Sequence, residues 1–322
     1  MDPRVGRGSG AGRRVLLVGA GRADLRGSVP VDPAGRGRAS EAGSGGTGSM
    51  RVREDLPPID WHPRLASTQD RLRELAAAGA AFGSAVVAEE QTAGRGRGGK
   101  GWVSVGGDGL WMSVLLARAP GGDLAGFPLV VGLRVAVGLE EWSGERIMVK
   151  WPNDLFVEVV PRDPSGGTRG PEWRKMGGIL CETVRSERGG KTRSAPSVAV
   201  GIGLNLTGAP EDAAALMPGG MRTLSVREAA SVVLDVLVPV PADTPLRLDE
   251  RVHEGLARRD LLKGRRVRSE VGVEGVASGM GVDGALVVRD DSGREHRIWS
   301  GSVRPTAGSF PSLESDSRGD VE

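Results

Sequence analysis

The 322-residue sequence has one cysteine, three histidines and no tyrosine, and aromatic residues make up only 3% of it. The single cysteine, Cys181, excludes an intramolecular disulfide framework and a zinc site built on cysteine clusters. The histidines, His62, His253 and His296, are too far apart for a zincin-type HExxH motif. No apolar run approaches the roughly 18–20 residues that a membrane-spanning helix needs. These absences favour a protein of the reducing cytoplasm that makes no membrane contact.

The charge is nearly balanced over the whole chain but unevenly distributed along it. The formal net charge is +2 and 39% of the residues are hydrophobic, which fits a globular protein of about two domains. Residues 1–50 hold eight arginines, four acidic residues and 13 glycines, with almost no apolar periodicity. A segment of this composition cannot bury a core, so we expect a disordered extension over 1–50. Met50 is a second candidate for the first residue of the protein.

Residues 51–262 have the pattern of an α+β domain. Helices are expected after Thr68, from Pro128, from the Ser225-x-x-Glu228 capping box up to Pro239, and over 246–262. Strands are expected at 84–89, 110–116, 147–151, 176–184 and 198–206. Residues 160–174 are rich in proline, glycine and charge, which indicates an exposed loop between paired strands.

The spacing of apolar residues and turn residues changes after Gly264. Short strands are expected at 267–270, 274–277, 285–289 and 294–299, separated by glycine turns. About 40 residues of this kind predict a small antiparallel barrel of the SH3-like type over 263–305. Residues 306–322 are expected to be a disordered tail.

The segment with the most conspicuous pattern of polar residues is the glycine-rich loop at 94–101. It contains five glycines and the cations Arg95, Arg97 and Lys100, so its backbone N–H groups and side chains could surround a phosphate. A solvated basic loop and an RGG-like contact to nucleic acid are the alternatives. A Walker P-loop is excluded, because Gly101 stands where that motif needs Ser or Thr for magnesium.

Three later segments place polar groups at the ends of expected strands. Asn153 and Asp154 follow Pro152 where a strand stops, which suits either a site or an ordinary turn. Lys175 precedes a Gly-Gly pair at the mouth of an apolar strand, where it could hold an anion or simply reach solvent. The Gly-Ile-Gly-Leu-Asn run that ends at Asn205 allows close approach of a ligand or tight packing within a sheet.

The order of these segments resembles that of the biotin protein ligases, the biotin–[acetyl-CoA-carboxylase] ligases, over roughly residues 62–304. The motifs that carry the resemblance are Ser67-Thr68-Gln69, the Gly-Arg-Gly-Arg run from Gly94 followed by Trp102, Lys-Trp-Pro-Asn-Asp at 150–154, Lys-Met-Gly-Gly-Ile-Leu-Cys-Glu at 175–182, and Gly-Ile-Gly-Leu-Asn at 201–205. The second and third motifs separate this pattern from that of the lipoate ligases. The implied fold is the class II synthetase-like catalytic domain of biotin and lipoate ligases, a mixed sheet flanked by helices, followed by the small barrel.

The resemblance implies a two-step ligation of biotin through biotinyl-AMP, with ATP and Mg²⁺, to a lysine of the biotin carboxyl carrier domain of an acyl-CoA carboxylase. It assigns biotin binding to Ser67, Thr68, Gln69, Gln91, Arg95, Gly96, Arg97 and Lys175. It assigns ATP binding to Arg95, Arg97, Lys100, Trp102, Asn153, Lys175 and Asn205, and catalysis to Lys175, Arg97 and Asp154. Mg²⁺ is placed near Asn153 and Asp154, without a defined ligand set.

Three departures from the family pattern and two competing functions complete the prediction. Lys100 stands where the family often has arginine, so charge is kept but the bidentate fork is lost, and the 160–174 loop is longer than usual. Residues 1–50 show no helix-turn-helix, so we expect a ligase that does not bind DNA; a homodimer is compatible with the pattern. A lipoate or octanoate ligase of the same fold is the first competitor. An RG-rich nucleic-acid-binding protein is the second, and the low aromatic content counts against it.

Overall fold

The computed structural model describes residues 55–104, 106–117, 124–160, 170–184, 187–188, 191–192, 197–217 and 225–306. The expected disordered extension over 1–50 lies outside these residues. The prediction that this segment contains no helix-turn-helix therefore also concerns residues that the structure does not describe. Most of the 160–174 loop and all of the expected tail except residue 306 also lie outside the described residues.

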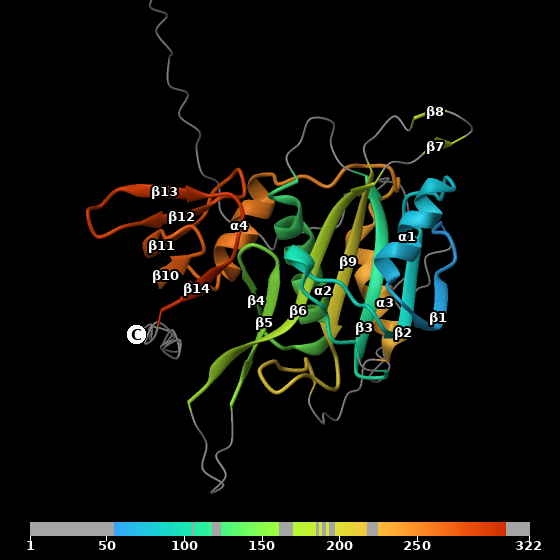
Figure 1. Ribbon diagram of the computed structural model, residues 1–322, viewed down its shortest axis with the longest axis horizontal. Coiled ribbons are helices and arrows are strands. Elements are labelled where there is room, and N and C mark those ends of the chain that lie inside the picture. Colours follow the sequence, from blue (N-terminus) through green and yellow to red (C-terminus); the bar gives the residue numbers. More distant parts are fainter. Residues whose placement is uncertain are drawn as a thin grey trace, which may run out of the picture.

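The larger part of the structure is built on a seven-stranded sheet with the strand order β1-β2-β3-β9-β6-β5-β4 (Figure 1). Its strands are β1 (Asp60–Leu65), β2 (Ala85–Gln91), β3 (Gly109–Ala117), β4 (Ile147–Lys150), β5 (Asp154–Val159), β6 (Glu172–Val184) and β9 (Ser197–Asn205). Strands β1 and β2 are parallel, and all the other neighbours are antiparallel. The predicted mixed sheet is therefore confirmed. The short strands β7 (Glu187–Arg188) and β8 (Lys191–Thr192) pair with each other.

Helices pack on both faces of this sheet (Figure 1). Helix α1 (Thr68–Ala77) buries Leu72 against Val86 of β2 and Leu115 of β3. The neighbouring strand residues, such as Val87 and Val114, point to the other face and join the main core with α2 (Phe127–Ser143) and α3 (Val226–Leu237). This alternation is the two-residue period of a strand buried on both faces. Helix α4 (Glu250–Arg259) contacts α2 and β4 and connects them to the C-terminal strands.

The C-terminal strands form an antiparallel sheet with the order β13-β12-β11-β10-β14. They are β10 (Arg266–Ser269), β11 (Glu274–Met280), β12 (Leu286–Arg289), β13 (Glu295–Ile298) and β14 (Val303–Pro305). A register shift between Ala277 and Gly279 interrupts the pairing of β11 with β12. In the part of the chain that the structure describes, β13 and β14 are the two edges and no pairing joins them, so the predicted closed barrel is not seen here.

Several predicted strand boundaries need correction. Strands β1, β5, β7, β8 and β14 were not expected, and β6 begins at Glu172, four residues before the predicted start at Met176. Trp173 explains the earlier start, because its side chain is buried in a small cluster with Met148 and Leu261. The strand expected at 147–151 ends at Lys150, where a turn begins.

The sequence patterns located the helices more accurately than the strands, with one exception. The Ser225 hydroxyl accepts from the Glu228 amide, and the Glu228 carboxylate accepts from the Ser225 amide, which confirms the predicted capping box of α3. The helix expected over 246–262 is wrong at both ends. Asp249 caps α4 by accepting from the amide of Val252, and the backbone of Asp260 is extended. None of the described helices is both long and apolar enough to cross a membrane.

Candidate active site

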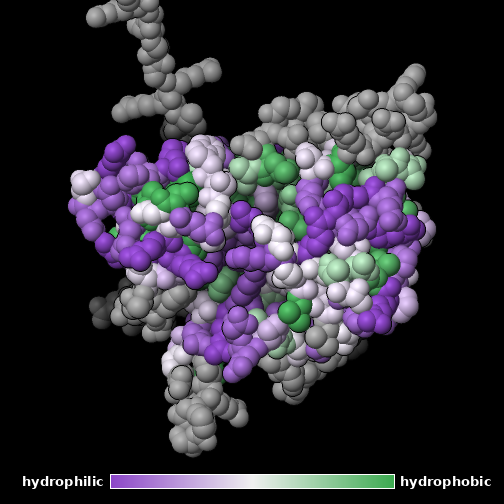
Figure 2. Space-filling model, in the orientation of Figure 1, coloured by the Kyte–Doolittle hydropathy of each residue, from purple (hydrophilic) through white to green (hydrophobic). Residues whose placement is uncertain are grey.

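A cavity of about 230 Å³ lies on the face of the sheet that carries α1. It is lined by the start of α1, the end of β2, the glycine-rich loop, the middle of β3, β6 and β9, the β4–β5 turn, and Ser302 of the C-terminal region. Twelve of the thirteen residues predicted from the sequence line it: Ser67, Thr68, Gln69, Gln91, Arg95, Gly96, Arg97, Lys100, Trp102, Asn153, Asp154 and Lys175. Hydrophilic residues prevail over α1 and over the C-terminal sheet on this face of the molecule (Figure 2).

Glycines of the central strands form the floor of the cavity. A Cβ at Gly203 would lie 2.5 Å from Cε2 of Trp102, and one at Gly178 would lie 3.2 Å from Cζ3 of the same ring. A Cβ at Gly201 would lie 3.0 Å from the side-chain oxygen of Gln69. The glycines therefore let the side chains of Trp102 and Gln69 lie directly against the sheet, which is the tight-packing alternative of the two that the sequence left open.

One end of the cavity is formed by neutral hydrogen-bonding groups. Gln91 Oε1 accepts from the amide of Thr68 at 2.8 Å and from its hydroxyl at 3.1 Å. The hydroxyls of Thr68 and Ser113 lie 2.9 Å apart, and Ser113 donates to Gln69 Oε1 at 3.0 Å. Ser67 Oγ is buried and has no hydrogen-bond partner among the described residues. Such an end suits a small neutral ligand with several donors and acceptors.

The glycine-rich loop folds back on itself at the mouth of the cavity. The amide of Gly96 donates to the carbonyl of Lys100 at 2.7 Å, and a bridge pairs Arg95 with Gly101. A short 3₁₀ turn, η1 (Arg97–Gly99), forms its tip, where the φ angles of Gly98 and Gly99 are 63° and 74°. These left-handed conformations explain why the tip is glycine.

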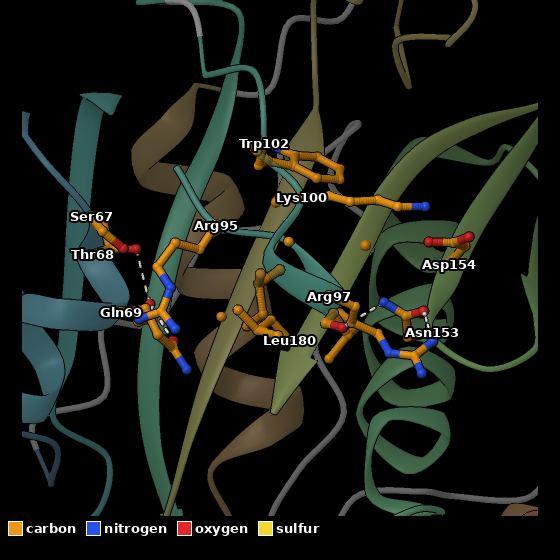
Figure 3. A pocket seen from close by; sticks show the side chains of 18 of the residues that line it. Ser67, Thr68, Gln69, Arg95, Arg97, Lys100, Trp102, Asn153, Asp154 and Leu180 are labelled. Atoms are coloured by element: carbon orange, nitrogen blue, oxygen red, sulfur yellow. Dashed lines mark hydrogen bonds between the residues drawn. The ribbon is translucent and has the colours of Figure 1, made fainter. Parts of the chain in front are cut away.

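The two arginines of the loop reach opposite ends of the cavity (Figure 3). Arg95 lies beside Gln69 and forms ion pairs at 2.8 Å with both Asp70 and Glu182. Arg97 donates to Asn153 Oδ1 at 3.1 Å and to the carbonyl of Gly301 at 3.5 Å. The loop thus connects α1 and β6 on one side with the β4–β5 turn and the C-terminal region on the other.

The other end of the cavity carries an excess of positive charge. Lys175 Nζ lies 2.7 Å from Asp154 Oδ1 and 5.1 Å from the centre of the Trp102 ring, while Lys150 Nζ lies 3.8 Å from Asp154 Oδ2. Burial lowers the pKa of Lys150, with Lys175, Arg304 and Arg97 acting in the same direction and Asp154 opposing them. One carboxylate therefore faces several cations, which suits a polyanionic ligand.

Asn205 is the one predicted residue that the structure places outside the cavity. It is buried at the end of β9 and donates to the carbonyl of Ala214 at 3.2 Å. Sequence reasoning missed Ser113, Lys150 and Ser302 as lining residues. A fully buried serine within the apolar strand β3 was a signal for the first, whereas no local pattern linked Ser302 to residues about 150 positions earlier.

The donor set does not form a metal cage by itself. The described residues contain no group of three or more His, Cys, Asp or Glu side chains that could hold an ion. Asp154 and Asn153 are the candidates, but Lys175 and Arg97 already contact their oxygens. Mg²⁺ commonly takes one or two carboxylates together with phosphate oxygens and water. The site therefore fits Mg²⁺ that is bound mainly by the phosphates of a nucleotide.

Residues 61–205 match the model of the Biotin/lipoate A/B protein ligase family. The biotin–[acetyl-CoA-carboxylase] ligase of Paracoccus denitrificans is 34% identical over 227 residues, which cover 65% of this chain and 85% of that protein. The bifunctional ligase/repressor BirA of Bacillus subtilis is 37% identical over 153 residues, and these cover 47% of this chain but only 41% of that protein. The biotin protein ligase of Aquifex aeolicus, solved in complex with biotin and ATP, superposes with a TM-score of 0.60 at 27% identity, covering 77% of this chain and 99% of that one.

Proposed function

The chain belongs to the biotin protein ligase family, and we propose that it uses ATP to join biotin to one lysine of a biotin carboxyl carrier domain of an acyl-CoA carboxylase. The observation that carries this proposal is that one cavity presents the hydroxyl and amide groups of Thr68, Gln69 and Gln91 at one end and the ammonium groups of Lys150 and Lys175 at the other. Biotin has a neutral ureido ring and an anionic tail, and ATP brings further negative charge. The two ends therefore match the two parts of the reaction.

In the first step, the biotin carboxylate attacks the α-phosphorus of ATP, the bond to the β-phosphate breaks, and pyrophosphate leaves. The biotin ring is bound by Ser67, Thr68, Gln69 and Gln91. The Ser67 hydroxyl has no hydrogen-bond partner among the described residues, so it is available to bond to the ring. Lys175 meets both the carboxylate and the α-phosphate, and Arg97 reduces the repulsion between the two anions. Asp154 orients Lys175 through their 2.7 Å ion pair.

In the second step, the amine of the acceptor lysine attacks the biotinyl carbonyl, and AMP leaves. No nucleophile of the enzyme is needed, which agrees with the lack of a Ser-His or Cys-His pair among the lining residues. Arg95, Gly96, Arg97 and Lys100 cover the mixed anhydride and exclude water. Trp102 and Lys100 are assigned to the nucleotide, with Asn153 beside it. Asn205 lies outside the cavity, where it donates to the carbonyl of Ala214, and receives no part in the reaction. Mg²⁺, when bound with ATP, neutralises phosphate oxygens near Asn153 and Asp154.

The organisation of the chain follows from the same proposal. Residues 51–262 form the catalytic domain, and residues 263–305 form a small SH3-like module whose Gly301 and Ser302 reach the cavity. Residues 1–50 and 306–322 are extensions without a catalytic role. We also propose a cytoplasmic enzyme that does not bind DNA; a homodimer is compatible with this organisation.

The competing functions are less well supported. The Paracoccus denitrificans relative and the solved Aquifex aeolicus structure described above are named for biotin, which favours it over lipoate or octanoate. A nucleic-acid-binding role for the loop would need outward-facing cations. Two of the three cations of the loop, Arg95 and Arg97, instead contact Asp70, Glu182 and Asn153 around the cavity.

Transfer to a carrier domain tests the proposal. The purified protein should attach biotin to an isolated carrier domain in the presence of ATP and Mg²⁺, as detected with labelled streptavidin and by mass spectrometry. A carrier whose acceptor lysine is replaced by arginine is the control and should stay unlabelled. Transfer of lipoate in place of biotin, or no transfer at all, would contradict the proposal.

A further inference from the structure

Asp70 and Glu182 hold the arginine of the loop that lies over the neutral end of the cavity. Arg95 donates to Asp70 Oδ1 through one terminal nitrogen and to Glu182 Oε1 through the other, each at 2.8 Å. Asp70 belongs to α1 and Glu182 to β6, so the guanidinium connects two elements that flank this end. The proposed binding and catalytic roles give neither carboxylate a function.

Glu182 also belongs to a continuous chain of hydrogen bonds along the cavity wall. Its Oε2 accepts from Gln69 at 3.1 Å, and Gln69 Oε1 accepts from Ser113, whose hydroxyl lies 2.9 Å from that of Thr68; the amide of Thr68 then donates to Gln91. Gln91 in turn donates to Ser104 at 2.9 Å. Gln91 precedes the glycine-rich loop and Ser104 follows it, so the chain runs from the arginine of the loop, through the neutral end, to both ends of the loop.

From these contacts we propose that Asp70 and Glu182 are positioning residues for Arg95, and that Glu182 links occupation of the biotin ring site to closure of the loop. The inference rests on the proposed function. Both carboxylates face cations: Arg73 pairs with Asp70 and lies 3.8 Å from Glu182. The cluster therefore fixes Arg95 by charge-assisted hydrogen bonds without leaving a carboxylate unpaired. A ligand that bonds to Gln69 orients Glu182 as well, which places Arg95 over that ligand.

Limited proteolysis tests the contact without relying on activity. Trypsin cuts after arginine and lysine, so cleavage after Arg97 or Lys100, identified by mass spectrometry, reports opening of the loop. Asp70→Asn and Glu182→Gln should each raise this cleavage rate about fivefold, because a partly exposed charge-assisted contact is lost and the open population grows. Glu74→Gln is the matched control: it lies on the same helix and pairs with Arg71 instead. Its cleavage rate should equal that of the wild type.

Kinetics then separate positioning from a general structural effect. In biotin-dependent pyrophosphate exchange, Asp70→Asn should raise the KM for biotin about fivefold with kcat nearly unchanged. Glu182→Gln should raise it further, since it also touches Gln69. In an Arg95→Ala background, Asp70→Asn should add nothing to the KM. The proposal is overturned if both carboxylate variants have the wild-type cleavage rate and the wild-type KM for biotin. It is also overturned if Asp70→Asn still raises the KM in the Arg95→Ala background. Absence of exchange in the wild type would instead contradict the proposed function, while proteolysis would still decide the contact.

Discussion

The ammonium group of Lys175 lies 2.7 Å from Asp154 Oδ1, at the strand β6 position that directly precedes the Met-Gly-Gly run. Because the lysine side chain is 37% exposed, it contributes little to the core. Lys175→Ala should therefore lower pyrophosphate exchange about a hundredfold or more while the thermal midpoint stays close to that of the wild type. Lys263→Ala removes an exposed lysine outside the cavity and serves as the control. Wild-type exchange by Lys175→Ala would show that its assigned role is wrong.

Loss of Arg97 should allow the reactive intermediate to escape. Arg97 connects the loop to Asn153 and Gly301, and Arg97→Gly removes both contacts while the neutral end of the cavity remains. We expect adenylation to continue and the off-rate of biotinyl-AMP to rise about tenfold. Lysines of a bystander protein such as albumin should become biotinylated. Arg64→Gly, at an exposed residue of β1, is the matched control. An unchanged off-rate without bystander labelling would contradict the role of the loop as a cover.

Gly203 should not tolerate a methyl group. An added Cβ would lie 2.5 Å from the Trp102 ring, so the ring would have to move away from the sheet and would no longer lie beneath Lys175. Overpacking of this kind costs about 1–3 kcal/mol. Gly203→Ala should raise the KM for biotin and ATP. It should also reduce the change in tryptophan fluorescence that occurs when these ligands bind. Gly170→Ala, where an added Cβ meets nothing within 4 Å, should leave both unchanged. Normal kinetics in Gly203→Ala would mean that the ring position is unimportant.

Asp260 should make stability depend on pH. It lies buried between α4 and the C-terminal sheet, and burial raises its pKa from 3.8 to about 6, against the opposing hydrogen bonds from the amides of Leu262, Lys263 and Met280. Between these values the unfolded state is ionised while the folded state keeps its proton. The free energy of unfolding therefore falls as pH rises from about 4 to 6, by about 3 kcal/mol.

Asp260→Asn should remove this contribution. Urea unfolding of both proteins at pH 4, 5, 6, 7 and 8 should show Asp260→Asn gaining stability relative to the wild type as pH increases, with no further change between pH 7 and 8. A difference between the two proteins that is constant over this range would contradict the raised pKa.

Local signals predicted the elements whose ends are set by their own side chains. The Ser225–Glu228 capping box located α3, and Pro128 located the start of α2, because each of these two signals acts within one helical turn. Strand β1 contains Pro63 at the edge of the sheet, and β5 follows directly on the Pro152-Asn153 turn. Neither shows the long apolar run that identified β3, so pairing with neighbouring strands, and not local propensity, determines them.

The candidate site was predicted in composition but not in its contacts. The motifs named the residues that line the cavity, since each motif brings several polar groups to one strand end or loop. The pairing of Arg95 with Glu182 joins residues 87 positions apart, and that of Arg97 with Gly301 joins residues 204 positions apart. Such contacts depend on how the loop, β6 and the C-terminal sheet pack, and no spacing in the sequence encodes them.

The central claim is that the cavity activates biotin with ATP, and exchange of labelled pyrophosphate into ATP measures this step directly. The purified wild-type protein should catalyse exchange that requires biotin and Mg²⁺ and that needs no carrier domain. Lipoate and octanoate at the same concentration should give only the background rate. Exchange that depends on lipoate or octanoate, or no exchange with any of the three acids, would contradict the account.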